Sequence, residues 1–173
     1  VQETNGKLNI LNRRGMERIT LNKKINLSEN ELFVYQNSFV TIDDKGNLIE
    51  IDTEGKVTIN KNLNIESILV SNRNTIVTMF ENKININNVS KKLPLSSYTI
   101  PQILEINSKI YISTTDKDNN LVYLFDNNGN ILEGFPIFGN TEIDMVYNNK
   151  SKSLKIIVGT NNSEISLIEI KRN

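Results

Sequence analysis

The residues of this chain that could do chemistry are its carboxylates, lysines and tyrosines. The 173-residue sequence contains no His and no Cys. Without an imidazole or a thiol, Ser-His-Asp and Cys-His nucleophilic arrangements are excluded, as are His-based and thiolate metal sites. Catalysis would therefore depend on Asp, Glu, Lys or Tyr, or on a bound cofactor.

One polar loop has the composition of a calcium site. The segment "TTDKDNN" (114–120) places Asp116 and Asp118 two residues apart, with Asn119 and Asn120 directly after them. Loop carboxylates and amide oxygens are ligands of Ca²⁺, but the ion needs six to eight oxygens. Two carboxylates in such a loop are more often solvated, so we expect no metal and no cofactor.

A glycosidase pair could be drawn from Glu50, Asp52 and Glu54, because most glycosidases use two carboxylates. Glu50 and Asp52 are expected on one face of a strand, inside a repeat that has no acids at matching positions elsewhere. We therefore expect no catalytic residue. The pair Asp43-Asp44, which precedes a Gly in "TIDDKGN", is explained by a turn in which an Asp side chain bonds the backbone.

Charge and composition narrow the function classes further. The chain has 20 Lys+Arg and 20 Asp+Glu, so no bulk basic field attracts nucleic acid. The pairs Arg13-Arg14, Lys23-Lys24 and Lys91-Lys92 are expected on the solvated surface. No apolar run approaches the roughly 20 residues that span a bilayer, so we expect no transmembrane segment. Ala is absent and Ile is abundant, which favours strands and turns over helices.

A repeat organises the chain around turn glycines. Gly15, Gly55 and Gly129 each lie between two short apolar segments. Three residues before each glycine stands a short polar side chain, namely Asn12, Asp52 and Asp126. Such a side chain bonds the backbone two residues on, and Gly supplies a positive φ. The predicted structural turn residues are therefore Gly15, Asp52, Gly55, Asp126 and Gly129.

Two weaker copies extend the repeat. The segment 83–95 aligns with Ser90 in the glycine position, and the segment 166–173 matches "LIEID" before the sequence ends. Successive copies are about 40 residues apart, a spacing typical of propeller blades or solenoid repeats.

Further strand candidates precede each copy, at 31–37, 38–44, 67–72, 75–82, 101–107, 109–116, 142–148 and 154–160. The pattern predicts an all-β fold: a β-propeller of about four four-stranded antiparallel blades in a single domain, 1–173. The predicted blades are 7–25 (half a blade), 31–62, 65–97, 100–138 and 141–173, the last lacking its outer strand. Pro94 and Pro136 are expected in outermost strands and Pro101 at the start of a first strand, where Pro is tolerated.

The register leaves partial blades at both ends, which favours the C-terminal part of a larger propeller whose N-terminal part would cap the final blade. Two alternatives stay open. One is a small closed ring with an irregular seam, and the other is an all-β sandwich of Greek-key type.

The segment "LVYLFDNNGNILEGFPI" (121–137) resembles the repeat of PQQ-like, quinoprotein-type propellers, in which an Asp-x-x-Gly turn ends the third strand, and repeats of bacterial envelope proteins. The segment 147–170 resembles an FG-GAP unit, whose calcium loop is rich in Asp. Here the matching residues include Asn148, Asn149 and Lys150 and no carboxylate. The chain also has no Trp for the docking positions of quinoproteins. The resemblance therefore implies the fold and neither ligand.

These observations predict a non-enzymatic protein-interaction or scaffold module in a β-propeller protein of the bacterial cell envelope. The resemblance implies a periplasmic or outer-membrane-associated location and a role in outer-membrane protein assembly or export. The expected partners are proteins, either a larger envelope complex or further N-terminal blades. The alternative is a carbohydrate-binding or glycoside-processing propeller whose active residues lie largely outside this chain.

Overall fold

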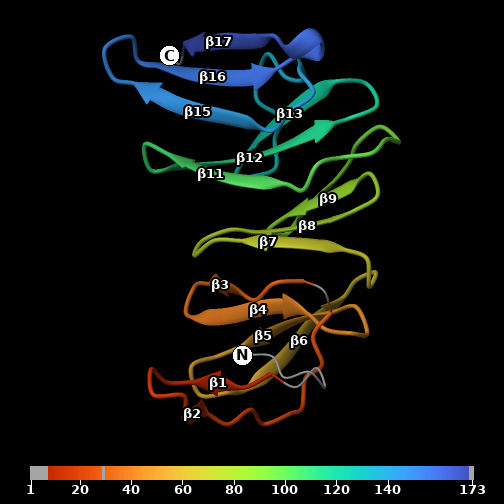
Figure 1. The fold of residues 1–173 in the computed structure, drawn as a ribbon, viewed down its shortest axis with the longest axis vertical. Coiled ribbons are helices and arrows are strands. Elements are labelled where there is room, and N and C mark those ends of the chain that lie inside the picture. The colour runs from red at the N-terminus through yellow and green to blue at the C-terminus, as the bar shows by residue number, and fades with distance from the viewer. Residues whose placement is uncertain (1–7, 29, 172–173) are drawn as a thin grey trace. The chain divides into compact units, whose positions relative to one another are not determined.

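The computed structural model describes residues 8–28 and 30–171, which are built from strands and turns. No α-helix occurs in these residues, and the single helical turn is a 3₁₀ turn, Asn161–Ser163. The chain divides into two compact units, residues 1–80 and 81–173, and each is described by itself. Most strands of both are labelled in Figure 1.

The first unit contains a four-stranded antiparallel sheet between two hairpins. The sheet has the order β3-β4-β5-β6. The first hairpin pairs β1 with β2, and the second pairs β7 with β8. The strands are β1 (Ile10–Leu11), β2 (Glu17–Ile19), β3 (Phe33–Tyr35), β4 (Ser38–Ile42), β5 (Asn47–Ile51), β6 (Val57–Asn62), β7 (Ile68–Ser71) and β8 (Ile76–Phe80).

The second unit contains a hairpin of β9 with β10, a four-stranded antiparallel sheet of order β11-β12-β13-β14 and a three-stranded sheet of order β15-β16-β17. Its strands are β9 (Lys83–Ile86), β10 (Val89–Lys92), β11 (Gln102–Ile106), β12 (Lys109–Asp116), β13 (Leu121–Asp126), β14 (Ile137–Phe138), β15 (Ile143–Asn148), β16 (Ser153–Gly159) and β17 (Ile165–Lys171).

The strands of each sheet follow one another in chain order, as in a meander. A Greek key places its fourth strand beside the first, so the sandwich alternative is wrong for these sheets. The inner strand β12 is covered on both faces, since its last six residues are all buried, including the polar residues from Ser113 to Asp116. The outer strand β6 is exposed after its first residue and is correspondingly polar.

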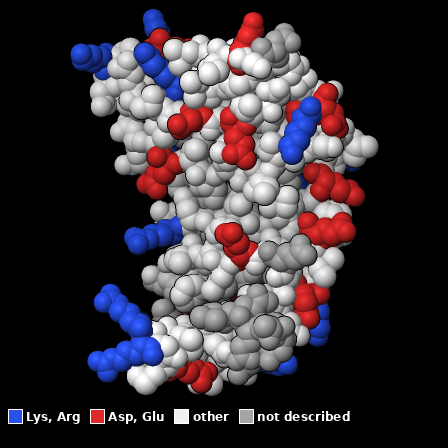
Figure 2. Space-filling model, viewed as in Figure 1, with Lys and Arg blue, Asp and Glu red and all other residues white. Residues whose placement is uncertain are grey.

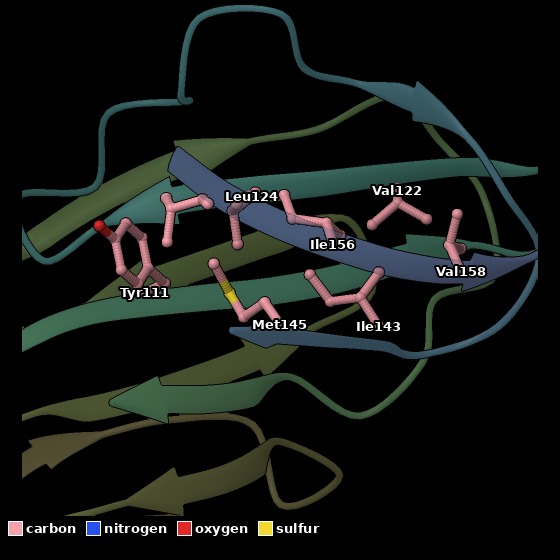
Figure 3. Close-up of a cluster of buried hydrophobic side chains, with 8 residues drawn as sticks. Tyr111, Val122, Leu124, Ile143, Met145, Ile156 and Val158 are labelled. Carbon is pink, nitrogen blue, oxygen red and sulfur yellow. The ribbon is translucent and has the colours of Figure 1, made fainter. Parts of the chain in front are cut away.

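Each unit has its own apolar core. The first unit includes two clusters of buried residues, one of Leu8, Ile25, Ile49, Ile51 and Val57 and one of Val40, Ile42 and Leu69. In the second unit one cluster of buried residues lies between the sheets β11–β14 and β15–β17, as Figure 3 shows. Its members are Tyr111, Val122, Leu124, Ile143, Met145, Leu154, Ile156 and Val158.

The glycine turns share one geometry. Gly15, Gly55 and Gly129 have φ values of +76°, +86° and +76°. In each turn the side chain three residues earlier accepts two backbone N–H bonds, and the glycine N–H donates to the backbone carbonyl of that same residue. A fourth copy of this turn runs from Asp43 to Gly46.

Some local expectations were wrong. Ser90 does not occupy a turn, because it lies in β10 opposite Asn85, and the chain reverses at Asn87, which has a φ of +51°. Pro94 and Pro136 lie outside the outer strands, two residues after β10 and directly before β14. Proline has no N–H for a ladder hydrogen bond, so these strands end or begin beside it. Pro101 likewise directly precedes β11.

Candidate functional site

The outward face of the sheet β15–β17 carries exposed apolar side chains. Along β17 exposed residues alternate with half-buried ones, as expected for a strand with one face on a core. The residues that face outward include Ile165, which is 71% exposed, and Leu167, which is 67% exposed. Apolar side chains therefore occupy positions that a solvated strand would fill with polar ones.

The strand register brings more apolar side chains onto this face. Leu167 lies directly opposite Ile157 of β16, and Ile165 lies opposite Gly159. Val146 of β15 lies opposite Lys155, which is two residues before Ile157 in β16, so Val146 and Ile157 are on the same face of the sheet. Ile157 is 43% exposed and Val146 is 59% exposed. We call the set Val146, Ile157, Ile165 and Leu167 the C-terminal face.

Charged residues border the C-terminal face. Asp144 lies opposite Ile157, and Glu169 lies opposite Lys155, so both signs of charge flank the apolar side chains. The hydroxyl of Ser153 donates a hydrogen bond to Glu169. That bond, with help from the Ser151 hydroxyl, lowers the pKa of Glu169, so this border carboxylate stays ionised. Figure 2 shows the same mixture of signs, interspersed with uncharged surface, on the side of the molecule that it displays.

Among residues 8–28 and 30–171, β17 neighbours only β16, so its other edge has no strand partner in that part of the chain. An edge strand presents free N–H and C=O groups that can template another strand. A partner could thus gain both main-chain hydrogen bonds from β17 and apolar contacts from the C-terminal face.

The loop predicted as a calcium candidate forms a closed hydrogen-bond network. Asp116 is fully buried and accepts hydrogen bonds from the Ser96 hydroxyl, from the backbone N–H of Asp118 and Asn119, and from the Asn119 side-chain amide. Asp118 accepts from the backbone N–H of Ser97 at 2.9 Å. These carboxylates therefore fix the loop 94–99 to the β12–β13 turn.

Ionisation in this network follows from its hydrogen bonds. Burial alone would raise the pKa of Asp116, but the bonds from Ser96, Asn119 and the backbone outweigh it, so the pKa lies below the ordinary value. The pKa of Tyr98 is raised by burial and by the charge of Asp116, and its hydroxyl donates to the carbonyl of Pro94 at 2.8 Å. Asp116 is thus a structural anion.

The glycosidase candidates are not assembled into a pair of free carboxylates. Glu50 lies in β5 and accepts a hydrogen bond from the Asn60 amide at 2.9 Å. Asp52 was expected on the same strand, but β5 ends at Ile51 and the Asp52 side chain accepts two backbone bonds of the turn. Glu54 is exposed within that turn.

The FG-GAP-like segment also forms a turn held by an amide. Asn148 accepts a hydrogen bond from the backbone N–H of Lys150 at 3.0 Å.

Across residues 8–28 and 30–171, no three His, Cys, Asp or Glu side chains gather in a way that would hold a metal ion. The same part of the chain contains no helix with the length and hydropathy needed to cross a bilayer.

The tyrosines were expected in the core between blades. Tyr111 and Tyr123 are 2% and 5% exposed, whereas Tyr35, Tyr98 and Tyr147 are half-buried.

The sequence did not predict the C-terminal face. The available signal was the "ISL" run at 165–167, in which two large apolar side chains are two residues apart beside a second apolar strand.

Comparison with known proteins identifies the fold. No protein-family model and no curated protein matches the chain. Among solved structures it is similar to BamB from Moraxella catarrhalis, with a TM-score of 0.53 and 14% identity over 97% of this chain and 53% of that one. It is also similar to BBS1N in a complex with ARL6DN, with a TM-score of 0.51 and 12% identity over 96% of this chain and 59% of that one.

A third similar structure is the dihydro-heme d1 dehydrogenase NirN, with a TM-score of 0.50 and 14% identity over 97% of this chain and 44% of that one. The chain spans about half the length of these structures. The all-β, propeller-type fold predicted from the sequence is confirmed.

Proposed function

We propose that this chain is a protein-interaction module of a β-propeller protein. Its partner packs on the C-terminal face and adds a strand to the free edge of β17. The observation that carries the proposal is the coincidence of four exposed apolar side chains with a sheet edge to which no described strand is paired. Exposed apolar groups that adjoin a template for main-chain pairing characterise binding by strand addition.

The other sheets of the chain indicate what kind of segment fits the edge of β17. The fourth strand β6 has the sequence Val-Thr-Ile-Asn-Lys-Asn and is exposed after Val57. We therefore expect the partner to supply a short extended segment with a β-branched residue at its start and polar residues after it. A flanking apolar surface of the partner would cover Leu167 and Ile157.

One of the similar structures supports this kind of function. BBS1N was solved in a complex with another protein, ARL6DN. The fold alone does not define a function, since propellers host many activities, so the proposal depends on the C-terminal face. The carbohydrate or glycoside alternative has no comparable support, because Glu50 and Asp52 serve local hydrogen bonds.

The remaining expectations from the sequence are retained as parts of this proposal. The blades are 31–62, 65–97, 100–138 and 141–173, with half a blade at 7–25, in the C-terminal part of a larger propeller with PQQ-like or FG-GAP-like repeats. In this proposal a protein partner, and not the N-terminal part of that propeller, adds the outer strand to the final blade 141–173. The protein acts in the bacterial cell envelope, where it assists outer-membrane protein assembly or export.

The test is a comparison of two matched aspartate substitutions. Leu167→Asp places a charge on the C-terminal face, and Ile59→Asp places one at an exposed apolar position of β6, which is 55% exposed. Proteins that the tagged wild-type chain captures from its native source are identified, purified and titrated against both variants. Loss of a buried leucine contact of about 1.5–3 kcal/mol predicts an affinity loss of about tenfold or more for Leu167→Asp.

We expect Ile59→Asp to bind the purified partner as the wild type does. Equal affinities for Leu167→Asp and the wild type would overturn the proposed surface. A wild-type dimer in sedimentation that dissociates in Leu167→Asp would also overturn it, because a second copy would then occupy the face.

A further inference from the structure

A pocket of about 250 Å³ opens in the second unit where two hairpin turns end. It is lined by Ile106, Asn107, Lys109, Tyr111, Tyr147, Lys152 and Leu154. Tyr147 and Leu154 lie on the core side of the sheet β15–β17, opposite to the C-terminal face. The pocket is therefore separate from the proposed protein-binding surface.

The first turn fixes Lys109 at the mouth of the pocket. Asn107 and Ser108 connect β11 to β12, and both have positive φ values, +51° and +59°. Such a two-residue turn matches the twist of the strands and fixes their register, with Ile106 opposite Lys109. Tyr111, two residues after Lys109, lies on the same face of β12 and belongs to the apolar core shown in Figure 3.

The second turn fixes Lys152. Its backbone is held by the Asn148 side chain, which accepts the N–H of Lys150, and by a hydrogen bond of 2.6 Å between the hydroxyls of Ser151 and Ser153. Lys152 itself has a φ of +52°. The turn is therefore ordered by bonds on both sides of Lys152, which lines the pocket.

The lining has a defined chemical character. Two lysine side chains contribute positive charge, and none of the lining residues is Asp or Glu. Leu154 is 1% exposed and Tyr111 is 2% exposed, so the floor is formed by the edge of the core. Asn107 adds an amide group at the rim. The site thus combines two cations at its mouth with an apolar and aromatic floor.

We infer that this pocket binds a small organic anion. A carboxylate or phosphate group lies between the ammonium groups of Lys109 and Lys152, and an apolar or aromatic body contacts Tyr147 and Leu154. Charge-assisted hydrogen bonds to an anion are about twice as strong as neutral ones, which favours this orientation. The volume lies below the usual range of roughly 300–1,000 Å³ for ligand pockets, so the ligand is about the size of one substituted ring.

The test is a titration of the isotope-labelled protein followed by NMR chemical shifts. The probes are benzoate, phenyl phosphate, inorganic phosphate and uncharged benzamide. We expect saturable shifts at Lys109, Tyr147 and Lys152 with benzoate or phenyl phosphate at about millimolar concentration, which corresponds to roughly 4 kcal/mol. The relative affinities of the two organic anions distinguish a carboxylate site from a phosphate site.

A double variant and a matched control identify the charges responsible. The double variant Lys109→Gln/Lys152→Gln is expected to bind the tighter-binding of the two organic anions about tenfold or more weakly, which equals about 1.4 kcal/mol or more of binding free energy. Lys150→Gln removes an exposed lysine of the same turn that does not line the pocket, and it is expected to leave affinity unchanged. The spectrum of each variant without ligand reports whether it is folded.

Three results would overturn the inference. Benzamide binding as tightly as benzoate would show that the lysines do not select an anion. Equal losses of anion affinity in Lys150→Gln and in the double variant would indicate general charge attraction and no specific role of Lys109 and Lys152. Inorganic phosphate binding as tightly as phenyl phosphate, without shifts at Tyr147, would show that the apolar floor takes no part.

Discussion

Replacing Gly55 by Ala tests whether the repeated turns differ in their surroundings although they share a conformation. Gly55 and Gly15 both lie in the first unit and have φ values of +86° and +76°. A Cβ at Gly55 would lie 2.5 Å from the backbone oxygen of Thr20 and 2.6 Å from a methyl group of Ile19. A Cβ at Gly15 would meet nothing within 4 Å. Gly15→Ala is therefore a matched control.

The expected losses of unfolding free energy follow from these contacts. A left-handed backbone costs Ala roughly 1–2 kcal/mol, partly offset by the lower entropy of the unfolded chain, so Gly15→Ala should cost about 1 kcal/mol. Gly55→Ala carries the same cost plus about 1–3 kcal/mol for overpacking, which gives about 2–4 kcal/mol. The carbonyl of Gly55 also accepts the N–H of Asn22, so the clash would strain that contact as well.

Thermal unfolding followed by circular dichroism measures both variants. For a chain of this size, 1 kcal/mol corresponds to a shift of about 2–4 °C, so Gly15→Ala should lower Tm by a few degrees and Gly55→Ala by roughly 5–15 °C. Hydrogen exchange should show the largest loss of protection in residues 19–22 and 52–57. Equal Tm shifts in the two variants would refute the packing of the segment 19–22 on the Gly55 turn.

Two further predictions concern the core and the buried carboxylate. Ile156→Ala should cost about 2–5 kcal/mol of unfolding free energy, because Ile156 is fully buried. Ile157→Ala should change the unfolding free energy by no more than about 0.5 kcal/mol, because Ile157 is on the outward face. Comparable losses in denaturant titrations would contradict the assignment of Ile156 to the core side of β16 and Ile157 to its outward side. Ser96→Ala should raise the pKa of Asp116 in NMR titrations, because one of the hydrogen bonds that lower it is lost. Because the pKa of Asp116 is lowered in the folded state, the Ser96–Asp116 hydrogen bond stabilises the protein at pH values above the ordinary pKa of 3.8. The difference in unfolding free energy between Ser96→Ala and the wild type should therefore narrow as the pH falls through the folded-state pKa of Asp116. A difference that does not change with pH would contradict this account.

Much of the local structure could be predicted from the sequence because its signals act over a few residues. Asp126 and Gly129 form a turn through bonds that span at most four residues, so their spacing alone indicates the geometry. The same logic failed at Ser90, where alignment to a glycine position suggested a turn. There the strands are joined through Asn87, which also adopts a positive φ, and the chain reverses three residues earlier.

The candidate sites were predicted less well because they depend on residues that are distant in the chain. Asp116 and Asp118 were expected to be solvated loop carboxylates because the sequence did not reveal their hydrogen-bond donors. Ser96 and Ser97 reach them from about 20 residues earlier and change exposed candidate ligands into structural acceptors. Nor could spacing indicate that Lys109 and Lys152 line the same pocket.

The sequence by itself determined the strands, the turns and the class of fold, because alternating apolar residues and Asx-Gly turns act through short-range sterics and hydrogen bonds. It also excluded His and Cys chemistry by composition. Only the tertiary structure decided which side of each strand became core, which left Ile165 and Leu167 exposed while Ile156 was buried. Burial is a collective property of packed sheets, since it depends on which surfaces meet after the strands have formed.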